Sequence, residues 1–446
     1  MLLLGNNEVP MNYKGNPYPF RQDSSFLYFT GVQTPGFALI MDMDSGEDTL
    51  YGYDLTVDDI IWMGALPGVK DWAAVGGLTS TADFAQLEPA LNAAQKSGRK
   101  VHILPPYRND HKILLSRMLQ IPIEELNSAA SEALIRGIIS LRSIKEEREI
   151  KQMEAALRTT HNIYLRVIKN ALPGVKEQIL AGLAEGMSIQ EGGRLAYPAI
   201  LSRDGQILHN HHHGHLLKDG DLVLADIGAE GPMGYASDIT RTFPVGPTFT
   251  ARQRDIYQIV LDAEVSSIDM LRPGITYKEV HLHAAHVITE GLKALGLMQG
   301  DSEEIVASGA HALFFPHGLG HMIGLDVHDM ENLGEDYVGY SAEVRRSSQF
   351  GTAYLRLGRA LETGFVLTVE PGIYFIPALI DQWKNEGRFR DFIRYEMVEQ
   401  WRDFGGVRIE DNVLITSDGH RVLGPPIPKT IKEIEEVKMI PGTRRS

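Results

Sequence analysis

The clearest pattern along the chain is a pair of short apolar runs, each framed by glycines and closed by an acid. The first reads Gly-Asp-Leu-Val-Leu-Ala-Asp226-Ile-Gly, and the second reads Gly-Phe-Val-Leu-Thr-Val-Glu370-Pro-Gly. Runs of this kind, rich in Val and Leu and bounded by glycine, are typical of buried strands. A second acid follows each run in a strand-like segment, Asp238 after the first and Glu410 after the second. The pattern predicts two related groups of strands that each carry two acids.

Helical patterns are duplicated in the same way. A capping box at Ser143 and Glu146 opens an amphipathic stretch that stops at the Leu-Pro-Gly of residues 172–174. Thr250 opens another, which stops at the Arg-Pro-Gly of residues 272–274, and a further helix-like segment follows each stop. This repetition indicates two related halves around a pseudo-twofold axis, which would bring the four acids together at the centre.

The expected elements divide the chain into two domains, as its 446 residues also suggest. Residues 1–136 predict a smaller α/β domain with a strand hairpin at 37–53 and a helix at 81–97, and show no catalytic constellation. Residues 143–430 carry the duplicated pattern and predict an α+β domain, with mostly antiparallel strands inside and helices outside. We expect residues 439–446 to be a frayed tail.

Composition narrows the class of protein. The chain is 43% hydrophobic and 23% charged, as in ordinary globular proteins, and its net charge of −15 argues against nucleic acid or an anionic membrane as partner. It has no cysteine, which excludes disulfides, thiolate metal sites and cysteine nucleophiles. No apolar run approaches the ~18 residues of a membrane span, and the start has no basic leader, so we expect a cytoplasmic protein. The abrupt strand-like start is compatible with a missing opening helix.

Four carboxylates and one imidazole make up a candidate metal site. In chain order they are Asp226, Asp238, His321, Glu370 and Glu410. Taken singly, an acid after a strand is more often a turn or cap residue, and a lone histidine is usually structural, but here the frame is repeated. An oxygen-rich set with one nitrogen suits Mn²⁺, Co²⁺ or Zn²⁺. If the five side chains converge, the protein is a two-metal hydrolase.

The segment around His321 gives the sharpest local signal. His317 and His321 have the spacing of a zinc-binding helix, but Gly318 and Gly320 argue against a helix, and the glutamate that such helices carry is missing. We therefore expect a strand or loop that presents several imidazoles, including His328, to one place.

At these motifs the sequence resembles the pita-bread metallopeptidases, which include aminopeptidase P and prolidase. The matching stretches are Ile207-Leu-His209, Leu224-Ala-Asp226-Ile-Gly, Ser237-Asp238-Ile-Thr-Arg-Thr-Phe, His317-Gly-Leu-Gly-His321, Asp326-Val-His328-Asp329, Thr368-Val-Glu370-Pro-Gly-Ile-Tyr and Arg408-Ile-Glu410-Asp. Weaker similarity at residues 20–31 extends the resemblance over nearly the whole chain. It implies a pita-bread catalytic domain behind a creatinase- or prolidase-type N-terminal domain, a proline-specific exopeptidase that cuts proline-containing peptides, and a homodimer.

The resemblance also implies a role for each metal ligand. Asp226 would chelate one ion, Asp238 and Glu410 would bridge two, and His321 and Glu370 would complete the second ion's shell. Two divalent cations are implied, with Mn²⁺ the first expectation and Co²⁺ or Zn²⁺ the alternatives. Cations so placed lower the pKa of a bound water enough for attack near neutral pH.

Further positions match residues that act on the substrate. Glu370 would pass a proton to the leaving proline nitrogen, and His317 and His328 would donate hydrogen bonds to the substrate carbonyl and oxyanion. His209 would line the proline pocket, and Arg408 would orient the site. The other histidines near His209 are an accessory metal binder or, more commonly, an exposed polar loop. One departure is the interval from Asp226 to Asp238, one residue longer than usual, which leaves the local strand register open.

Two features bear on which proline peptidase this is. The insertion at residues 375–405 resembles that of prolidases, and Arg356 stands where prolidases carry an arginine for the dipeptide carboxylate, although alone it reads equally as a surface arginine. We therefore favour an Xaa-Pro dipeptidase over an aminopeptidase P acting on longer peptides. A ligand-free binding module and a metal-free creatinase-like hydrolase are the other readings, and both are disfavoured because all five ligands are present.

Overall fold

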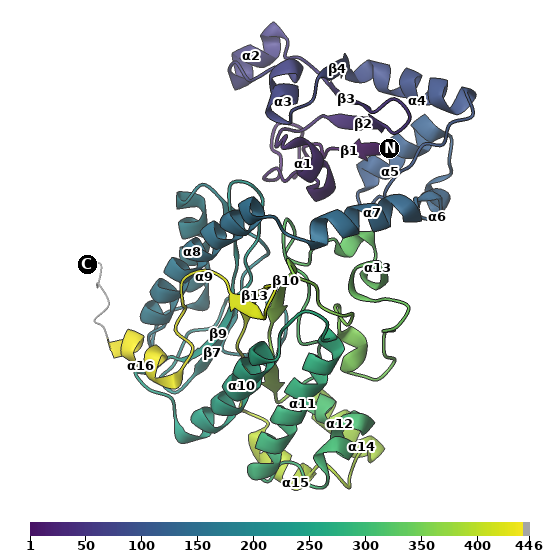
Figure 1. Cartoon of the computed structure of the whole chain (residues 1–446). Helices are drawn as coiled ribbons and strands as arrows, with labels where there is room; N and C mark the ends of the chain where they lie inside the picture. Colours follow the sequence, from purple (N-terminus) through teal and green to yellow (C-terminus); the bar gives the residue numbers. More distant parts are fainter. Residues whose placement is uncertain (440–446) are drawn as a thin grey trace. The chain divides into compact units, whose positions relative to one another are not determined.

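Two units make up the part of the chain that the computed structural model describes, residues 1–439 (Figure 1). The first unit comprises residues 1–141 and the second begins at Arg142. The frayed tail expected at the C-terminus lies outside the described residues from residue 440 onward. The functional domains expected at residues 1–136 and 143–430 stay proposals, with boundaries close to this division.

The first unit is built on one four-stranded sheet. Its strands are β1 (Leu2–Leu4), β2 (Ala38–Asp42), β3 (Glu47–Gly52) and β4 (Ser80–Asp83) in that spatial order. The first three are antiparallel, so the expected hairpin is present, and β4 is parallel to β3. The helices are α1 (Ser24–Thr30), α2 (Val57–Met63), α3 (Val69–Val75), α4 (Leu87–Lys96), α5 (Asn109–Leu119), α6 (Leu126–Ala129) and α7 (Glu132–Ser143), the last crossing the division.

The helix expected at residues 81–97 begins later than predicted. Residues 81–83 belong to β4, whose backbone pairs with β3, and only residues 87–96 form the helix α4. The carboxylate of Asp83 accepts a hydrogen bond from the amide of Ala85, which ends the strand and starts a short 3₁₀ turn before α4. Long-range strand pairing has therefore overridden the local helical pattern.

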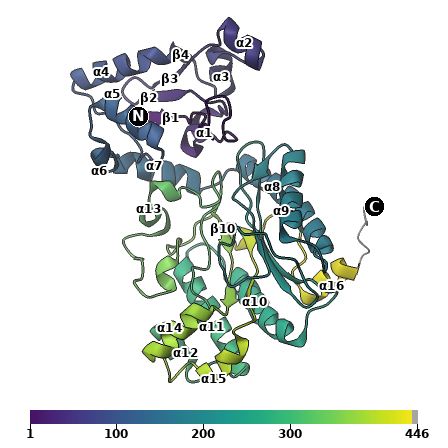
Figure 2. The same ribbon diagram turned by 180° about the vertical axis from the view of Figure 1, so that it is seen from behind.

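Paired helices frame the second unit and repeat as the sequence indicated. Helix α8 (Glu147–Asn170) packs on α9 (Glu177–Gln190), and α10 (Ala251–Asp269) packs on α11 (Tyr277–Ala294). The views of Figures 1 and 2 show both pairs against the strands. The remaining helices are α12 (Ser302–Ser308), α13 (Glu335–Gly339), α14 (Pro377–Glu386), α15 (Tyr395–Val398) and α16 (Ile431–Met439).

The turn inside each helix pair has the same bonding. Gly174 and Gly274, the glycines of the two Pro-Gly stops, have φ of 86° and 89°, a conformation that favours glycine. The amide of Gly174 donates to the carbonyl of Leu217 at 2.8 Å, and that of Gly274 donates to Leu361 at 2.8 Å. The two halves therefore repeat in hydrogen bonding as well as in sequence.

One helix start was predicted correctly and the other was not. Thr250 caps α10, accepting from the amide of Gln253, whose side chain accepts in turn from Thr250. Ser143 does not open α8, because it is the last residue of α7. The cap is Glu146, whose amide donates to the carboxylate of Glu149 at 2.8 Å, so the box lies three residues later than expected.

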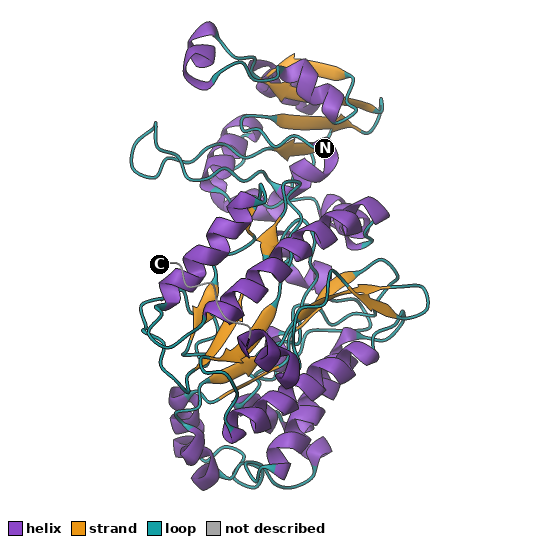
Figure 3. Ribbon diagram, turned by 90° about the vertical axis from the view of Figure 1, so that its left-hand side faces the viewer, coloured by secondary structure: helices purple, strands orange, loops and turns teal. Residues whose placement is uncertain are grey.

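Strands of the second unit meet where the acids lie. The strands are β5 (Arg194–Leu195), β6 (Ile200–Ser202), β7 (Leu222–Asp226), β8 (Ala229–Glu230), β9 (Thr240–Pro244), β10 (Val366–Val369), β11 (Gly372–Tyr374), β12 (Gly406–Arg408), β13 (Asp411–Ile415) and β14 (His420–Val422). They form the antiparallel groups β6-β7-β9, β10-β13-β14, β11-β12 and β5-β8, with helices around them (Figure 3). A bridge between Thr240 and Glu410 joins the two larger groups.

The register left open by the long interval between Asp226 and Asp238 is now defined. Asp226 pairs with Thr240 in the β7–β9 ladder. A turn takes up the extra length: the amide of Gly231 donates to Tyr235, and that of Gly234, with φ of 84°, donates to Gly231. Among residues 1–439, no helix has the length and apolar character needed to span a membrane.

Candidate active site

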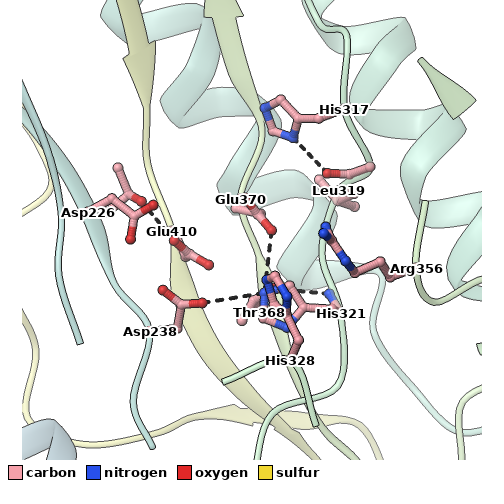
Figure 4. Close-up of polar contacts among 12 residues, drawn as sticks. Asp226, Asp238, His317, Leu319, His321, His328, Arg356, Thr368, Glu370 and Glu410 are labelled. Atoms are coloured by element: carbon pink, nitrogen blue, oxygen red, sulfur yellow. Dashed lines mark hydrogen bonds and ion pairs between the residues drawn. The ribbon is translucent and has the colours of Figure 1, made fainter. Parts of the chain in front are cut away.

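The four acids reach one place because each sits at the end of a strand. Asp226 ends β7 and Asp238 lies just before β9, while Glu370 follows β10 and Glu410 precedes β13. The ligand atoms of Asp238, His321 and Glu410 lie within 4.8 Å of one another, and all three side chains are buried. Figure 4 shows Asp226 beside Glu410, and Glu370 directed toward His321.

His321 reaches the acids because its segment runs alongside β10. The amide of His321 donates to the Thr368 hydroxyl at 3.1 Å, and the amide of Thr368 donates to the His321 carbonyl at 3.0 Å. Gly320 permits this approach, since a Cβ there would lie 2.1 Å from the carbonyl oxygen of Thr368. The expected glycine-rich loop or strand is present, and its glycines serve close packing.

One imidazole nitrogen of His321 is left for a ligand. Its Nδ1 contacts the carbonyl of Met322 at 3.0 Å and acts as the donor there, which leaves the lone pair on Nε2. Nε2 lies 3.3 Å from Asp238 and 3.7 Å from Glu370. Burial lowers the pKa of His321 to about 4, so the ring is neutral near pH 7, as a metal ligand must be.

Tyr197 joins the first two acids. Its hydroxyl lies 2.5 Å from an oxygen of Asp226 and 2.5 Å from an oxygen of Asp238. A phenol has one hydrogen to donate, so it can satisfy only one of two ionised carboxylates. When both carboxylates are ionised, Asp226 and Asp238 repel each other. A positive charge between them, such as a bound cation, would remove this repulsion.

Arg408 orients two of the acids from β12. Its Nη2 donates to Asp226 at 2.6 Å, and its Nε donates at 3.1 Å to the Thr240 hydroxyl, which donates in turn to Glu410 at 2.7 Å. Its Nη1 donates to Tyr374 at 2.9 Å. Because Nε, Nη1 and Nη2 all contact protein atoms, these contacts support the orienting role of Arg408 rather than direct substrate binding.

The site's acids fit divalent cations. Burial, followed by the neighbouring acids, raises the pKa of Asp238, Glu370 and Glu410 well above the ordinary values. The buried Oε1 of Glu410 has no hydrogen-bond partner among the described residues. Crowded acids around an unsatisfied carboxylate oxygen and a free imidazole lone pair are the chemistry of a cation site.

The other histidines that match the family motifs differ in their hydrogen-bond partners. His317 Nδ1 contacts the carbonyl of Gly318, and its Nε2 contacts the Tyr374 hydroxyl, both at 2.8 Å. Because Nδ1 is the donor to the Gly318 carbonyl, Nε2 accepts from Tyr374, and donating to a substrate would require His317 both to leave Tyr374 and to gain a proton on Nε2. His328 Nδ1 lies 2.5 Å from Glu331. His209 lines the cavity, together with His317 and His328.

A cavity of about 790 Å³ connects the acids with the arginine predicted to bind substrate. Arg356 lines it, with Nε 3.4 Å from Glu331 and 3.4 Å from Glu335, and that Nε has no hydrogen-bond partner among the described residues. Gly318 allows the backbone before Arg356 to pack against the His317 segment, because a Cβ on residue 318 would lie 2.5 Å from Leu355. Arg356 therefore lies in the cavity but between two acids.

The other histidines near His209 have separate partners. His213 Nδ1 contacts the carbonyl of Leu201 at 3.0 Å, and His215 Nδ1 lies 3.5 Å from both Glu177 and Asp204. His211 lines the cavity. None of them belongs to the group formed by Asp238, His321 and Glu410.

Several residues of the site were not assigned by sequence reasoning. Tyr374 and Thr240 lie inside motifs that match the family, so their position in the sequence could have indicated that they belong to the site. Tyr197, Glu331 and Glu335 carry no such signal, since their neighbours at the site are distant in sequence or lie across a turn.

Comparison with known proteins agrees with the family resemblance seen in the sequence. The model of metallopeptidase family M24 matches residues 151–417, and that of the aminopeptidase P N-terminal domain matches residues 1–103. The chain belongs to metallopeptidase family M24. It is an enzyme of the metallopeptidase type, with the pita-bread fold that the resemblance implied, and its family implies divalent metal ions.

Relatives of this M24 protein carry two names. A "Probable Xaa-Pro aminopeptidase" of Botryotinia fuckeliana is 35% identical, over 95% of this chain and 87% of that protein. An "Xaa-Pro dipeptidase" of Mus musculus is 31% identical, over 98% of this chain and 87% of that protein. Zn-substituted aminopeptidase P of E. coli in complex with product has a TM-score of 0.80 and 30% identity, over 99% of this chain and 94% of that chain.

Tyr197→Phe should weaken metal binding by about 10- to 100-fold, the usual cost of losing a group that orients a metal ligand. Without the phenol, Asp226 and Asp238 lose their shared contact, and the two carboxylates are free to move apart. Titration calorimetry with Mn²⁺ measures the change. Tyr235→Phe is a matched control, because the Tyr235 hydroxyl donates to Glu149, which is not one of the five candidate ligands. Equal affinities in wild type and Tyr197→Phe would contradict the prediction.

Proposed function

We propose that this protein hydrolyses the bond between an N-terminal residue and proline, using two divalent cations, and that its preferred substrates are Xaa-Pro dipeptides. The use of metal ions is supported by the convergence of Asp238, His321 and Glu410, in which Oε1 of Glu410 has no hydrogen-bond partner among the described residues. The names of relatives on both sides of the family, Xaa-Pro aminopeptidase and Xaa-Pro dipeptidase, support the specificity for proline.

As the family resemblance implies, Asp226, Asp238, His321, Glu370 and Glu410 would hold the two cations, with Asp226 on one ion, His321 and Glu370 on the other, and Asp238 and Glu410 shared between them. Bound cations would lower the pKa of a water molecule and so supply the nucleophile. Glu370, whose carboxylate lies 3.7 Å from His321 Nε2, would carry a proton to the leaving proline nitrogen. His328 and His317 would contact the substrate carbonyl, which each ring can do as a donor only once its Nε2 carries a proton, and His209 would line the proline pocket.

The preference for dipeptides rests on Arg356. Its guanidinium lines the cavity and has an unsatisfied Nε, so it can pair with the carboxylate that ends a dipeptide. Arg356→Ala should raise KM for an Xaa-Pro dipeptide by about 10-fold or more while leaving kcat near its wild-type value, because the lost contact is made equally in the ground and transition states. Steady-state kinetics on an Xaa-Pro dipeptide and a matched Xaa-Pro-Yaa tripeptide measure this. Efficient tripeptide cleavage that Arg356→Ala does not diminish would overturn the dipeptidase assignment.

Aminopeptidase activity on longer peptides is the second candidate. Glu331 and Glu335 each lie 3.4 Å from Arg356 Nε, so an incoming dipeptide carboxylate must compete with them. A longer peptide would place an uncharged peptide bond there. The solved structures of aminopeptidase P that resemble this chain also favour this reading.

We propose Mn²⁺ as the physiological metal, with Co²⁺ and Zn²⁺ as alternatives, because one nitrogen and several carboxylate oxygens suit a hard or borderline cation. Metal analysis after dialysis, followed by activity with each ion added back, tests this choice. Highest activity with an ion other than Mn²⁺ would replace it.

We also propose that the chain forms a homodimer. Helix α2 buries none of its residues and exposes an apolar surface, with Trp62 86% exposed. Exposed apolar groups of this size usually mark a contact surface. The residues are Val57, Ile60, Ile61, Trp62 and Met63. Sedimentation should give a dimer for wild type and a monomer for Trp62→Glu; a monomeric wild type would overturn the proposal.

A further inference from the structure

Glu331 links two side chains that the proposed reaction uses. One oxygen of its carboxylate, Oε2, lies 2.5 Å from His328 Nδ1 and 3.4 Å from Arg356 Nε. Glu335 lies at the same 3.4 Å from Arg356, but of the two acids only Glu331 reaches His328 within the described part of the chain. The chain therefore offers two acids at the same distance from the arginine, of which Glu331 contacts His328 and Glu335 pairs with Arg346 at 2.7 Å.

The turn that brings Glu331 to His328 is tightly held. Met330, between them, is fully buried and has φ of 63°, a left-handed conformation that a non-glycine residue adopts only at a cost of about 1–2 kcal/mol. Asp329 pairs with Arg142 at 2.7 Å and with Lys145 at 2.8 Å, and its amide donates to Met322 at 2.9 Å. The buried ion pairs of Asp329 and the left-handed conformation of Met330 thus fix the geometry of the turn.

The contact determines how the His328 ring is presented. A carboxylate only accepts hydrogen bonds when ionised, and the hydrogen bond from His328 lowers the pKa of Glu331 to about 2. Nδ1 of His328 is therefore the donor to Glu331, and the ring's second nitrogen, Nε2, is left for the cavity that His328 lines. The His321 ring, 4.4 Å away in an edge-on contact, limits rotation from the other side.

We propose that Glu331 is a positioning residue of this active site: it holds His328 through Nδ1, with Nε2 directed to the substrate, and ties that ring to Arg356. The inference rests on the proposed function, because it concerns the same substrate contacts. In this proposal the orientation of the His328 ring depends on Glu331, which also lies beside Arg356. Glu331 thereby couples recognition of the far end of the substrate to the hydrogen-bond acceptor that His328 presents in the cavity, because a neutral ring that donates through Nδ1 can only accept through Nε2.

Glu331→Gln tests this, with Glu335→Gln as the matched variant. Both remove one negative charge near Arg356, so both should lower KM for an Xaa-Pro dipeptide. Only Glu331→Gln should also reduce kcat, by about 10- to 100-fold, because the neutral amide accepts more weakly than the carboxylate and its NH₂ can turn toward Nδ1 and favour the other tautomer. Glu331→Asp, which retains the carboxylate, should recover part of kcat. Equal kcat values for the two glutamine variants would overturn the proposal.

Nitrogen NMR of the histidine rings gives a readout independent of turnover. The His328 signal, identified by its loss in His328→Gln, should show protonated Nδ1 in wild type and in Glu335→Gln, and a changed tautomer mixture in Glu331→Gln. An unchanged His328 signal in Glu331→Gln would overturn the inference. If wild type cleaves no Xaa-Pro peptide, the proposed function fails, whereas the NMR comparison still decides whether Glu331 positions His328.

Discussion

Glu410→Gln should reduce peptidase activity by at least about 1000-fold. The substitution keeps the shape of the side chain and removes one charge from the group formed with Asp238 and His321. A cation that stabilises developing charge contributes several kcal/mol, and each 1.4 kcal/mol is a factor of ten in rate. Activity with saturating Mn²⁺, together with metal content measured after dialysis, checks the result.

The same substitution should stabilise the metal-free protein. Burial and the charges of Asp238 and Asp226 raise the pKa of Glu410 well above its ordinary value, which means that its ionised form is disfavoured in the fold. The amide of glutamine carries no charge, and its N–H groups can donate to the neighbouring carboxylates where Oε1 now has no partner. With chelator present, the free energy of unfolding should therefore rise.

Adding Mn²⁺ should reverse the order, because wild type gains binding energy that Glu410→Gln has lost. Glu362→Gln, an exposed acid paired with Arg359, is the control and should change neither activity nor metal-dependent stability. A Glu410→Gln variant that is less stable than wild type in chelator would show that the acids are not held together against repulsion.

The repeat explains why the centre of the site could be predicted from sequence. Each acid is adjacent to a strand whose apolar run is visible locally, and the strand ends carry the acids to the junction where Thr240 bridges Glu410. His321 required an additional clue, the glycines around it, of which Gly320 is closely approached by the backbone of Thr368 and Gly318 by that of Leu355. Local signals were sufficient because the chain repeats the same frame.

Residues that modify the site carried no comparable signal. Tyr197 follows a short strand and meets Asp226 and Asp238 only through tertiary folding. The role of Glu331 depends on the left-handed turn at Met330, which no local preference indicates. Arg356 was predicted to bind substrate and does line the cavity, but the two acids beside it were not predicted, because pairing across a turn is decided by backbone geometry rather than by composition.

Asp329→Asn should destabilise the fold by about 3–5 kcal/mol, the cost of removing one partner from a buried ion pair. Burial alone would raise the pKa of Asp329, but the charges of Lys145 and Arg142 lower it below its ordinary value of 3.8. Its stabilising effect is therefore complete above the ordinary pKa and is lost as pH falls through the lowered value. Asparagine would remove the anion paired with buried Lys145 and would leave Arg142 paired with the partly exposed Asp326 at neutral pH. Urea unfolding at pH 7 measures the loss.

Asp326→Asn is the matched control, since Asp326 pairs with the same Arg142 at 3.0 Å but its side chain is 35% exposed. Exposed ion pairs contribute about 0–1 kcal/mol, so this variant should lose little stability. Because Asp329 anchors the turn that carries His328, Asp329→Asn should also lower kcat under conditions where the protein is still folded, and Asp326→Asn should not. Equal losses of stability in the two variants would contradict the view that a buried charge network holds this turn in place.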